Sequence, residues 1–151
     1  MLLNRCNPNF GIVLDLIGEA SRNAQNLHRP VTSANSFISS DQILYVLTDP
    51  KRNKYIVFLF FNNYESHSHL CECSGNGAVL GIIKTGPKKL FLLNHKGVQH
   101  EMNLSCILDF YIHESCQRMG LGKLLFDHYL KASFKIQLVF FWHWFFSHDY
   151  C

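Results

Sequence analysis

The sequence lacks the features that would place it in several large classes of protein. It contains neither G-x-x-x-x-G-K nor G-x-G-x-x-G, which excludes the usual P-loop and dinucleotide-binding motifs. Its apolar runs are shorter than the ~20 residues that cross a membrane, and a proline interrupts the short apolar start, unlike a secretory leader. Lysine and arginine are scattered without interleaved aromatic residues. We therefore expect no membrane span and no nucleic-acid partner.

The cysteines and histidines do not follow a recognised cross-linking pattern. The six cysteines are irregularly spaced, and with no leader they predict free thiols in the reducing cytoplasm rather than a disulfide framework. Four potential zinc ligands occur between His67 and Cys73, as H-x-H and C-x-C. Structural zinc sites use C-x₂₋₄-C, and the spacing seen here would crowd alternate ligands onto one extended segment. We expect no metal site.

The composition is that of a globular chain, with 48% hydrophobic and 17% charged residues and a formal charge of +3. The 151 residues predict a single domain over 1–151. Apolar residues at three- and four-residue intervals predict an amphipathic helix over residues 12–27, which ends before Pro30. Alternating apolar residues then predict a strand over residues 43–47.

The middle of the chain predicts a meander of strands separated by turn residues. We expect strands at residues 78–84, 89–93, 98–103 and 105–112, of which the last is central. A bulge is expected at Gly81, a turn at Gly86-Pro87, and a tight hairpin at residues 94–97. Because strands precede the next helix, the predicted fold class is α+β, with a mixed, mainly antiparallel sheet and flanking helices.

Two intervals do not fit this plan. Residues 51–76 combine a continuous apolar run with the histidine and cysteine cluster, and we interpret them as a loop insertion. Residues 139–151 are aromatic without a stable period, and we interpret them as a divergent tail. With that tail in place of further elements, the predicted sheet is missing its final strands.

A glycine-spaced turn joins the last predicted strand to a helical pattern that starts near Leu124. Gly120 and Gly122 lack a Cβ atom and tolerate positive φ, so a pyrophosphate could approach the backbone closely. The N–H groups and dipole at the helix start favour an anion there. Arg118 and Lys123 add positive charge. The turn therefore predicts a phosphate-binding loop.

This turn, Q-R-x-G-x-G between strand and helix, resembles the acetyl-coenzyme A loop of the general N-acetyltransferase superfamily. CILDFYIHES at residues 106–115 resembles the α-tubulin N-acetyltransferase family more specifically. Four shorter pieces follow the family's order: AQNL at 24–27, TSA at 32–34, GIIK at 81–84 and KKLF at 88–91. The resemblance covers roughly residues 10–49 and 77–138.

The resemblance implies an acetyltransferase-like fold and transfer of an acetyl group from acetyl-CoA to a lysine of α-tubulin in microtubules. It also implies a cytoplasmic, cytoskeleton-associated protein in which Gln25 and Cys106 are catalytic. The cofactor-binding residues that it implies are Phe110, Tyr111, Ile112, His113, Glu114, Ser115, Cys116, Gln117, Arg118, Met119, Gly120, Leu121, Gly122 and Lys123.

The general base is left open by the sequence. Cys106 and Asp109 lie three residues apart on a predicted strand, so they point to opposite faces unless a bulge intervenes, and we expect Asp109 to be structural. An ungapped comparison puts Phe141 where the family has an aspartate. Two alternatives are a catalytically impaired relative that binds microtubules or the cofactor, and an acetyltransferase for another amine.

Overall fold

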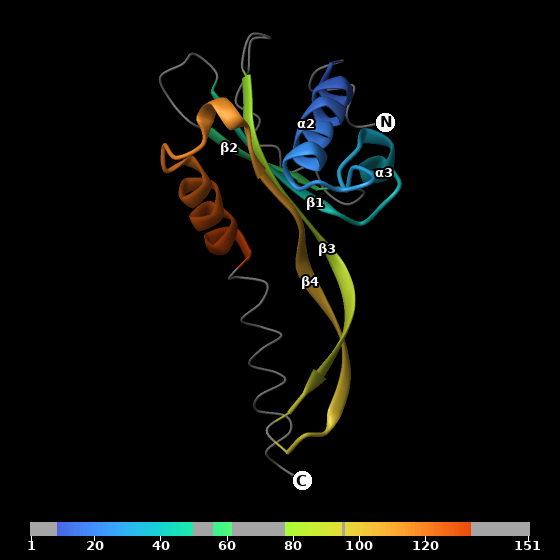
Figure 1. Cartoon of the computed structure of the whole chain (residues 1–151). Coiled ribbons are helices and arrows are strands. Elements are labelled where there is room, and N and C mark those ends of the chain that lie inside the picture. The colour runs from blue at the N-terminus through green and yellow to red at the C-terminus, as the bar shows by residue number, and fades with distance from the viewer. Residues whose placement is uncertain (1–8, 50–55, 62–77, 95, 134–151) are drawn as a thin grey trace.

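The computed structural model describes residues 9–49, 56–61, 78–94 and 96–133. Two helices come first, and a long pair of strands follows two shorter strands (Figure 1). The elements are α2 (Phe10–Ala24), α3 (Ala34–Ile38), β1 (Ile43–Asp49), β2 (Ile56–Phe61), β3 (Ala78–Leu93), β4 (Gln99–Ile112) and the short 3-10 helix η1 (Glu114–Cys116). A further helix, described over residues 121–133, is here called the 121–133 helix.

The four described strands form one sheet in the order β2-β1-β3-β4, and every neighbouring pair is antiparallel. This arrangement confirms the predicted α+β class. Among these strands β4 lies at one edge, so its predicted central position is not seen within the described part of the chain. The final strands of the prediction concern residues beyond 133, which lie outside the described residues.

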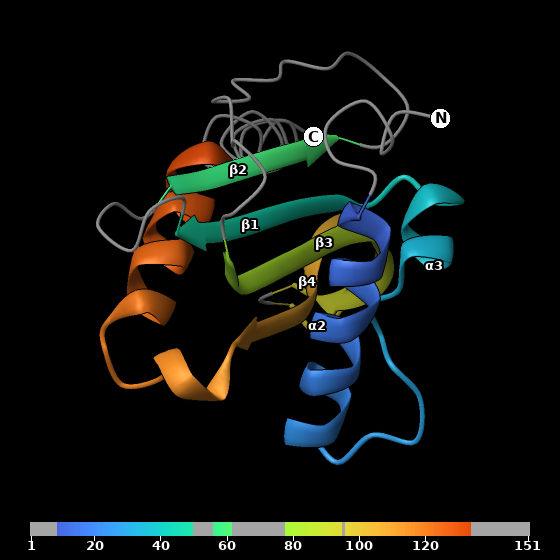
Figure 2. The same ribbon diagram turned by 90° about the horizontal axis from the view of Figure 1, so that it is seen from above.

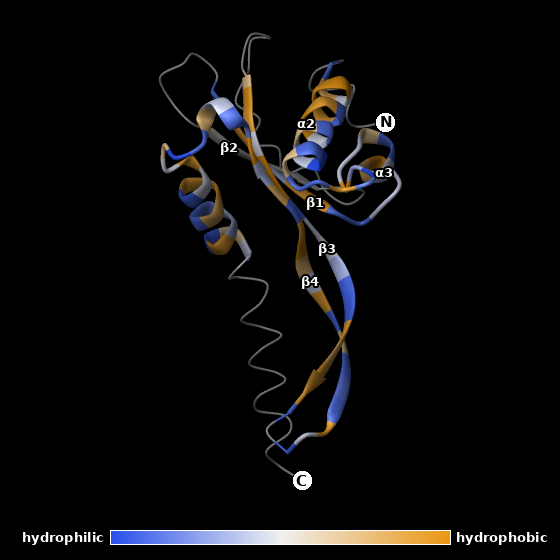
Figure 3. Cartoon of the chain, viewed as in Figure 1, coloured by the Kyte–Doolittle hydropathy of each residue, from blue (hydrophilic) through white to orange (hydrophobic). Residues whose placement is uncertain are grey.

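Helices cover both faces of the sheet (Figures 1 and 2). On one face, here called the α2 face, α2 and α3 pack over an apolar cluster consisting of Leu14, Ile17, Phe37, Leu44, Val46, Ile82 and Tyr111. On the opposite face, here called the 121–133 face, the cluster consists of Tyr45, Leu47, Leu80, Ile83, Ile112, Leu121, Leu125 and Tyr129. Figure 3 shows hydrophobic stretches on β1 and the adjoining half of β3.

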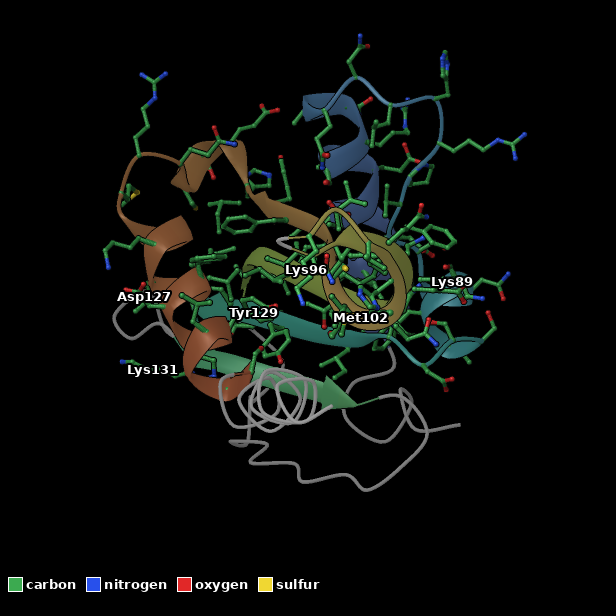
Figure 4. The ribbon with its side chains drawn as sticks, turned by 90° about the horizontal axis from the view of Figure 1, so that it is seen from below. Lys89, Lys96, Met102, Asp127, Tyr129 and Lys131 are labelled. Carbon is green, nitrogen blue, oxygen red and sulfur yellow. The ribbon has the colours of Figure 1, made fainter. Side chains whose placement is uncertain are left out.

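The far half of β3 and β4 extends beyond the rest of the sheet as a two-stranded hairpin (Figure 1). Figure 4 looks along this hairpin, with Lys89, Lys96 and Met102 near the viewer. An exposed ion pair joins Lys89 Nζ to Glu101 Oε1 at 2.5 Å across its two strands. The hairpin turn follows Asn94, whose side-chain oxygen accepts hydrogen bonds from the N–H groups of Lys96 and Val98. The predicted tight connection is confirmed.

The predicted turn at Gly86-Pro87 is wrong, because β3 runs straight through both residues. Pairing with β1 ends at Thr85, and no other described strand pairs with that side of β3 beyond this residue. A proline, which has no N–H, is tolerated where a strand edge needs no donor. The predicted strands at 98–103 and 105–112 are likewise parts of one strand, β4.

Two β-bulges interrupt the sheet. In the pairing of β1 with β3, Leu47 faces Gly81 and Thr48 faces Val79, which leaves Leu80 as the extra residue, next to the predicted position. In the pairing of β3 with β4, Lys84 faces Asp109 and Thr85 faces Ile107. Leu108 is therefore the extra residue there. A single extra residue reverses which face the following side chains occupy.

The first helix starts and ends earlier than predicted. It covers Phe10–Ala24 instead of residues 12–27, because Asn26 takes a left-handed conformation with φ 53°. The N–H of Asn26 donates to Asn23 O at 3.2 Å and that of Leu27 to Arg22 O at 3.0 Å. This paired arrangement is a Schellman cap, which ends a helix by satisfying its last carbonyl groups.

Within residues 51–76, the expectation of a loop is corrected for residues 56–61. They form β2, which pairs with β1 from Ile43 opposite Phe61 to Thr48 opposite Ile56. A continuous run of β-branched and aromatic residues suits a strand. The rest of that interval, including the cluster from His67 to Cys73, and the tail at 139–151 with Phe141 lie outside the described residues.

Two features are absent from the described part of the chain. None of its helices is both long and apolar enough to cross a membrane. The described residues also contain no group of three or more histidine, cysteine, aspartate or glutamate side chains that could hold a metal ion.

Candidate functional site

The predicted phosphate-binding loop follows the end of β4 and is anchored to the sheet. The N–H of His113 donates to Leu80 O at 2.8 Å, so the chain leaves β4 still attached to β3. The Gln117 side chain then reaches back, with Nε2 donating to Ile112 O at 2.9 Å. Within η1, the His113 ring nitrogen Nδ1 accepts from the N–H of Ser115 at 3.3 Å. These contacts fix both ends of the loop.

The turn itself is left-handed at two residues. Arg118 has φ 60° and Gly120 has φ 79°. A Cβ atom built on Gly120 would meet no atom within 4 Å, so the space above its backbone is open. An L side chain at that φ would be strained. Gly120 therefore has both properties predicted for close approach of a pyrophosphate.

Gly122 differs from the prediction. It lies in the first turn of the 121–133 helix, and its conformation is helical. A Cβ atom there would lie 3.6 Å from Ile112 Cγ1 and 3.7 Å from Phe110 Cζ, which are ordinary van der Waals contacts. Positive φ is thus required at Gly120 and not at Gly122.

The helix that follows offers backbone donors to the loop. Its first-turn N–H groups have no carbonyl partner within the helix, and its dipole adds positive potential at this end. The Leu124 N–H is the first to be satisfied, donating to Gly120 O at 3.0 Å. Lys123 is exposed, and its Nζ lies 2.5 Å from Asp127 Oδ2. Arg118 is therefore the more available of the two predicted cations.

The predicted cofactor-binding residues divide into exposed and buried side chains. Tyr111, Ile112 and Leu121 are buried in the two apolar clusters, so only their backbone could face a ligand. Phe110 is partly exposed, and its ring stacks on that of Phe126 at a centroid distance of 6.1 Å. The exposed side chains are those of His113, Glu114, Ser115, Gln117, Arg118, Met119 and Lys123.

A second polar site lies on the α2 face and is centred on the carboxylate of Asp109, which is 4% exposed. Ser21 Oγ donates to its Oδ1 at 2.8 Å, and Thr32 Oγ1 donates to its Oδ2 at 2.5 Å. The Gln25 amide nitrogen Nε2 donates to Oδ1 at 3.0 Å and to Ser21 Oγ at 2.7 Å. Three side chains from α2 and the segment after it thus converge on one residue of β4.

Lys84 is a buried cation that interacts electrostatically with this carboxylate. It faces Asp109 across the β3–β4 pair, is 1% exposed, and donates through Nζ to the carbonyl oxygen of Val31. Burial lowers the pKa of Lys84, and attraction to the Asp109 carboxylate opposes that shift. A buried charge is costly unless it is paired, so Lys84 and Asp109 stabilise each other's placement.

The bulge at Leu108 changes the predicted relation of Cys106 to Asp109. Cys106 faces Gly86 and Asp109 faces Lys84, and these partners lie two residues apart on β3. Residues directly opposite in an antiparallel pair share a face, as do alternate residues of a strand. Cys106 and Asp109 therefore both lie on the α2 face, because the bulge named as the exception to the opposite-face prediction is present at Leu108. The Cys106 thiol is half-buried and its Sγ donates to Leu104 O at 3.6 Å.

The two sites are connected through β4. Asp109 precedes Ile112, the last residue of the strand, by three residues, which corresponds to about 10 Å of extended chain. Gln25, at the C-cap of α2, is exposed beside the buried carboxylate. The strand β4 therefore links the open turn at Gly120 to the carboxylate that binds the exposed Gln25 amide.

An antiparallel sheet whose strand leads through an open glycine turn into a helix is the arrangement expected of an N-acetyltransferase. The family model described as GNAT acetyltransferase, Mec-17, matches residues 2–62 and 67–137, and the chain belongs to this family.

Curated relatives agree with that membership. The chain is 43% identical over 126 residues to the alpha-tubulin N-acetyltransferase of Schistosoma japonicum, covering 82% of this chain and 41% of that protein. It is 38% identical over 136 residues to that of Trichoplax adhaerens, covering 85% and 49%. For alpha-tubulin N-acetyltransferase 1 of Danio rerio the identity is 37% over 124 residues, covering 82% and 35%. The chain thus spans a third to a half of these relatives' length.

Sequence reasoning missed most of the network around Asp109. Thr32 and Lys84 stand in two of the short pieces, TSA and GIIK, that carried the family resemblance, and this was a usable signal. Ser21 lies on the predicted helix without any local motif. The position of Asp109 beneath Gln25 depends on the bulge at Leu108, which no residue type in β4 marks.

Proposed function

We propose that this chain binds acetyl-CoA on the loop after β4 and transfers the acetyl group to a lysine side chain of α-tubulin in microtubules. The observation that carries the proposal is the open, left-handed turn at Gly120 within the segment matched by the family model. The relatives are alpha-tubulin N-acetyltransferases by name, and these names support the α-tubulin substrate. The same names support a cytoplasmic, cytoskeleton-associated protein.

The loop residues fit a coenzyme A pyrophosphate by chemistry. The backbone of Gly120 is open to close approach, and the first-turn N–H groups of the 121–133 helix donate toward it. Arg118 adds an exposed positive charge beside them. We assign binding to the backbone of the residues from Phe110 to Lys123, with the exposed side chains at the periphery. When bound, the cosubstrate supplies the acetyl thioester.

The transfer requires a neutral lysine amine held against the thioester. The amine nitrogen bonds to the carbonyl carbon, the carbon–sulfur bond breaks, and the coenzyme leaves as the thiol after the amine gives up a proton. Because free lysine has a pKa near ~10.4, a group on the protein must help to remove protons from the amine. We assign Gln25 and Cys106 as the catalytic residues, since both lie on the α2 face. The Gln25 amide does not take up a proton, so its part is to hold the amine.

Cofactor binding is tested by comparing two loop variants. Gly120→Trp places a large side chain in the open space at φ 79° and is expected to abolish coenzyme A binding. Arg118→Ala removes one exposed charge and is expected to weaken binding by about fivefold or less, as exposed charges contribute ~1 kcal/mol or less. Calorimetric titration with coenzyme A measures both.

The same titration defines failure of the proposal. Equal losses in the two variants would show that the backbone turn is not the binding surface. No binding by the parent chain would contradict the assignment of the cosubstrate altogether. Thermal melting of both variants provides the folding control, because Gly120 and Arg118 are exposed and their replacement leaves both apolar clusters intact.

A further inference from the structure

The Asp109 carboxylate determines which end of the Gln25 amide faces outward. An ionised carboxylate only accepts hydrogen bonds, so the Gln25 atom that lies 3.0 Å from Asp109 Oδ1 is the NH₂ nitrogen. Ser21 Oγ donates to the same Oδ1 and accepts from the same Nε2, at 2.8 and 2.7 Å. The three groups form a closed triangle in which every donor has an acceptor. A flipped amide would place two oxygens in contact.

The carboxylate that fixes this orientation is itself held from several sides. Thr32 Oγ1 donates to Oδ2, Lys84 faces it on β3, and the surrounding side chains are almost fully buried: Ser21 is 2% exposed, Thr32 0% and Lys84 1%. Gln25, in contrast, is exposed. Its NH₂ group therefore points to the buried carboxylate, and its carbonyl oxygen Oε1 is the end left for a partner.

We propose that Asp109 is a positioning residue that turns the Gln25 amide so that Oε1 faces the substrate and accepts a hydrogen bond from its amino group. This inference rests on the proposed function, because it names the substrate's amine as the donor. A carbonyl oxygen is an acceptor without a charge, so it orients an amine nitrogen while leaving the lone pair that forms the new bond directed elsewhere. A glutamine without Asp109 would present either end of its amide.

The orientation is tested by nuclear magnetic resonance on the full chain. The Gln25 side-chain amide signal is assigned by its loss in Gln25→Ala. In the parent we expect an Nε2 proton of Gln25 to exchange with water about tenfold more slowly than in free glutamine. A hydrogen bond to a charged group slows exchange by about this factor. Asp109→Asn, which replaces the carboxylate by a neutral amide, should reduce this protection. Ile17→Val, a buried change on the same helix that alters no hydrogen-bonding group of the network, should retain it.

The catalytic consequence is tested by a double-mutant cycle on acetyl transfer to α-tubulin. Gln25→Ala and Asp109→Asn should each lower kcat/KM by about tenfold or more, and the double variant should be no worse than Gln25→Ala. Ile17→Val should keep the parent's kcat/KM at equal folded fraction. Additive losses would overturn the role given to Asp109, since they would show that it acts without Gln25.

The outcomes separate this inference from the proposed function. An unprotected Gln25 amide in the parent, or equal protection in the parent and Asp109→Asn, overturns the orientation whether or not the chain acetylates tubulin. If Asp109→Asn does not fold, the exchange rate of the Gln25 amide in the parent alone decides whether the amide is held as proposed. A protected amide in a chain that binds no coenzyme A and transfers no acetyl group would contradict the proposed function and leave the orientation by Asp109 supported.

Discussion

The two faces of the sheet are covered by helices in different ways. On the 121–133 face the contacts are apolar and aromatic: the Tyr45 and Tyr129 rings meet edge to face at 5.3 Å, and Phe126 lies 5.9 Å from Tyr129. Figure 4 shows Tyr129 between that helix and the strands. On the α2 face an apolar cluster adjoins a buried network of charged and hydroxyl groups around Asp109.

This difference shows how one sheet serves both stability and chemistry. Burial of apolar surface contributes free energy without demanding particular partners, so the 121–133 face tolerates a mainly apolar interface. One buried hydrogen bond, between the Tyr45 hydroxyl and Ser133 Oγ at 3.4 Å, lies within it. Burial of Lys84 and Asp109 is unfavourable unless each polar atom is satisfied. A fold retains such a network where a function requires it. The proposed function assigns the amine-handling chemistry to the α2 face, and the 121–133 helix to stabilising the sheet and presenting the loop.

The largest expected effect comes from breaking the apolar face. Leu125 is fully buried on the 121–133 helix, and Leu125→Ala should lower the free energy of unfolding by about 2–5 kcal/mol through lost burial and a cavity. Leu124→Ala is the matched control, because Leu124 is 43% exposed and its loss should change stability by less than about 1 kcal/mol. Urea denaturation measures both, and equal effects would contradict an apolar core on this face.

The next effect comes from the close approach of α2 to the polar network. A Cβ atom on Gly18 would clash with the carbonyl oxygen of Thr32, so Gly18→Ala must push α2 away and should cost about 1–3 kcal/mol. Gly11→Ala on the same helix meets only Ala34 Cβ, at 3.6 Å. It should stabilise by ~0.5–1 kcal/mol through helix propensity.

Thermal and urea denaturation of these two glycine variants tests the contact directly. The displacement of α2 in Gly18→Ala should also lower the protection of the Gln25 amide from exchange. Ser21 and Gln25 move with the helix, while Asp109 stays on β4. A Gly18→Ala protein as stable as Gly11→Ala would show that α2 does not contact the Thr32 backbone as described.

The smallest effect is a pH dependence confined to the 121–133 helix. Burial lowers the pKa of His128 below 6.5, with repulsion from Lys131 acting in the same direction. Just below pH 6.5 the unfolded chain therefore binds more protons than the folded one, and stability should rise with pH through that window. His128→Gln should reduce the slope of the free energy of unfolding against pH, measured by urea denaturation between about pH 5 and 7. This range is chosen around the ordinary histidine pKa of about 6.5. If the slope is unchanged in His128→Gln, the pH dependence of stability comes from groups other than His128.

Local sequence patterns predicted the elements well where each residue's role is local. The helix of α2, the hairpin after Asn94 and the loop at Gly120 all follow from apolar spacing and turn chemistry. The predictions were wrong where the backbone conformation depends on neighbouring residues or strands in the fold. Pro87 marks a turn in most contexts, yet it continues β3 here because the pairing with β1 ends at Thr85. Asn26 ends α2 through a left-handed cap before Pro30 is reached.

The site was predictable only in part. The open turn at Gly120 follows from its residue type and position, and the structure bears it out, while Gly122 proved to be an ordinary helical residue. The relation between Asp109 and Cys106 depends on the extra residue Leu108, which changes the face without changing the sequence spacing. Tertiary pairing therefore had to be known before the α2 face could be recognised as polar.

The central claim is that the polar α2 face handles the amine during acetyl transfer. The most direct measurement incubates the parent chain and Gln25→Ala, at equal folded fraction, with microtubules and labelled acetyl-CoA, and locates the label by mass spectrometry. We predict label on a lysine of α-tubulin with the parent and about tenfold less with Gln25→Ala, the upper end of the loss expected for one hydrogen bond. Equal labelling by both proteins, or no labelling by a parent that binds coenzyme A, would contradict the claim.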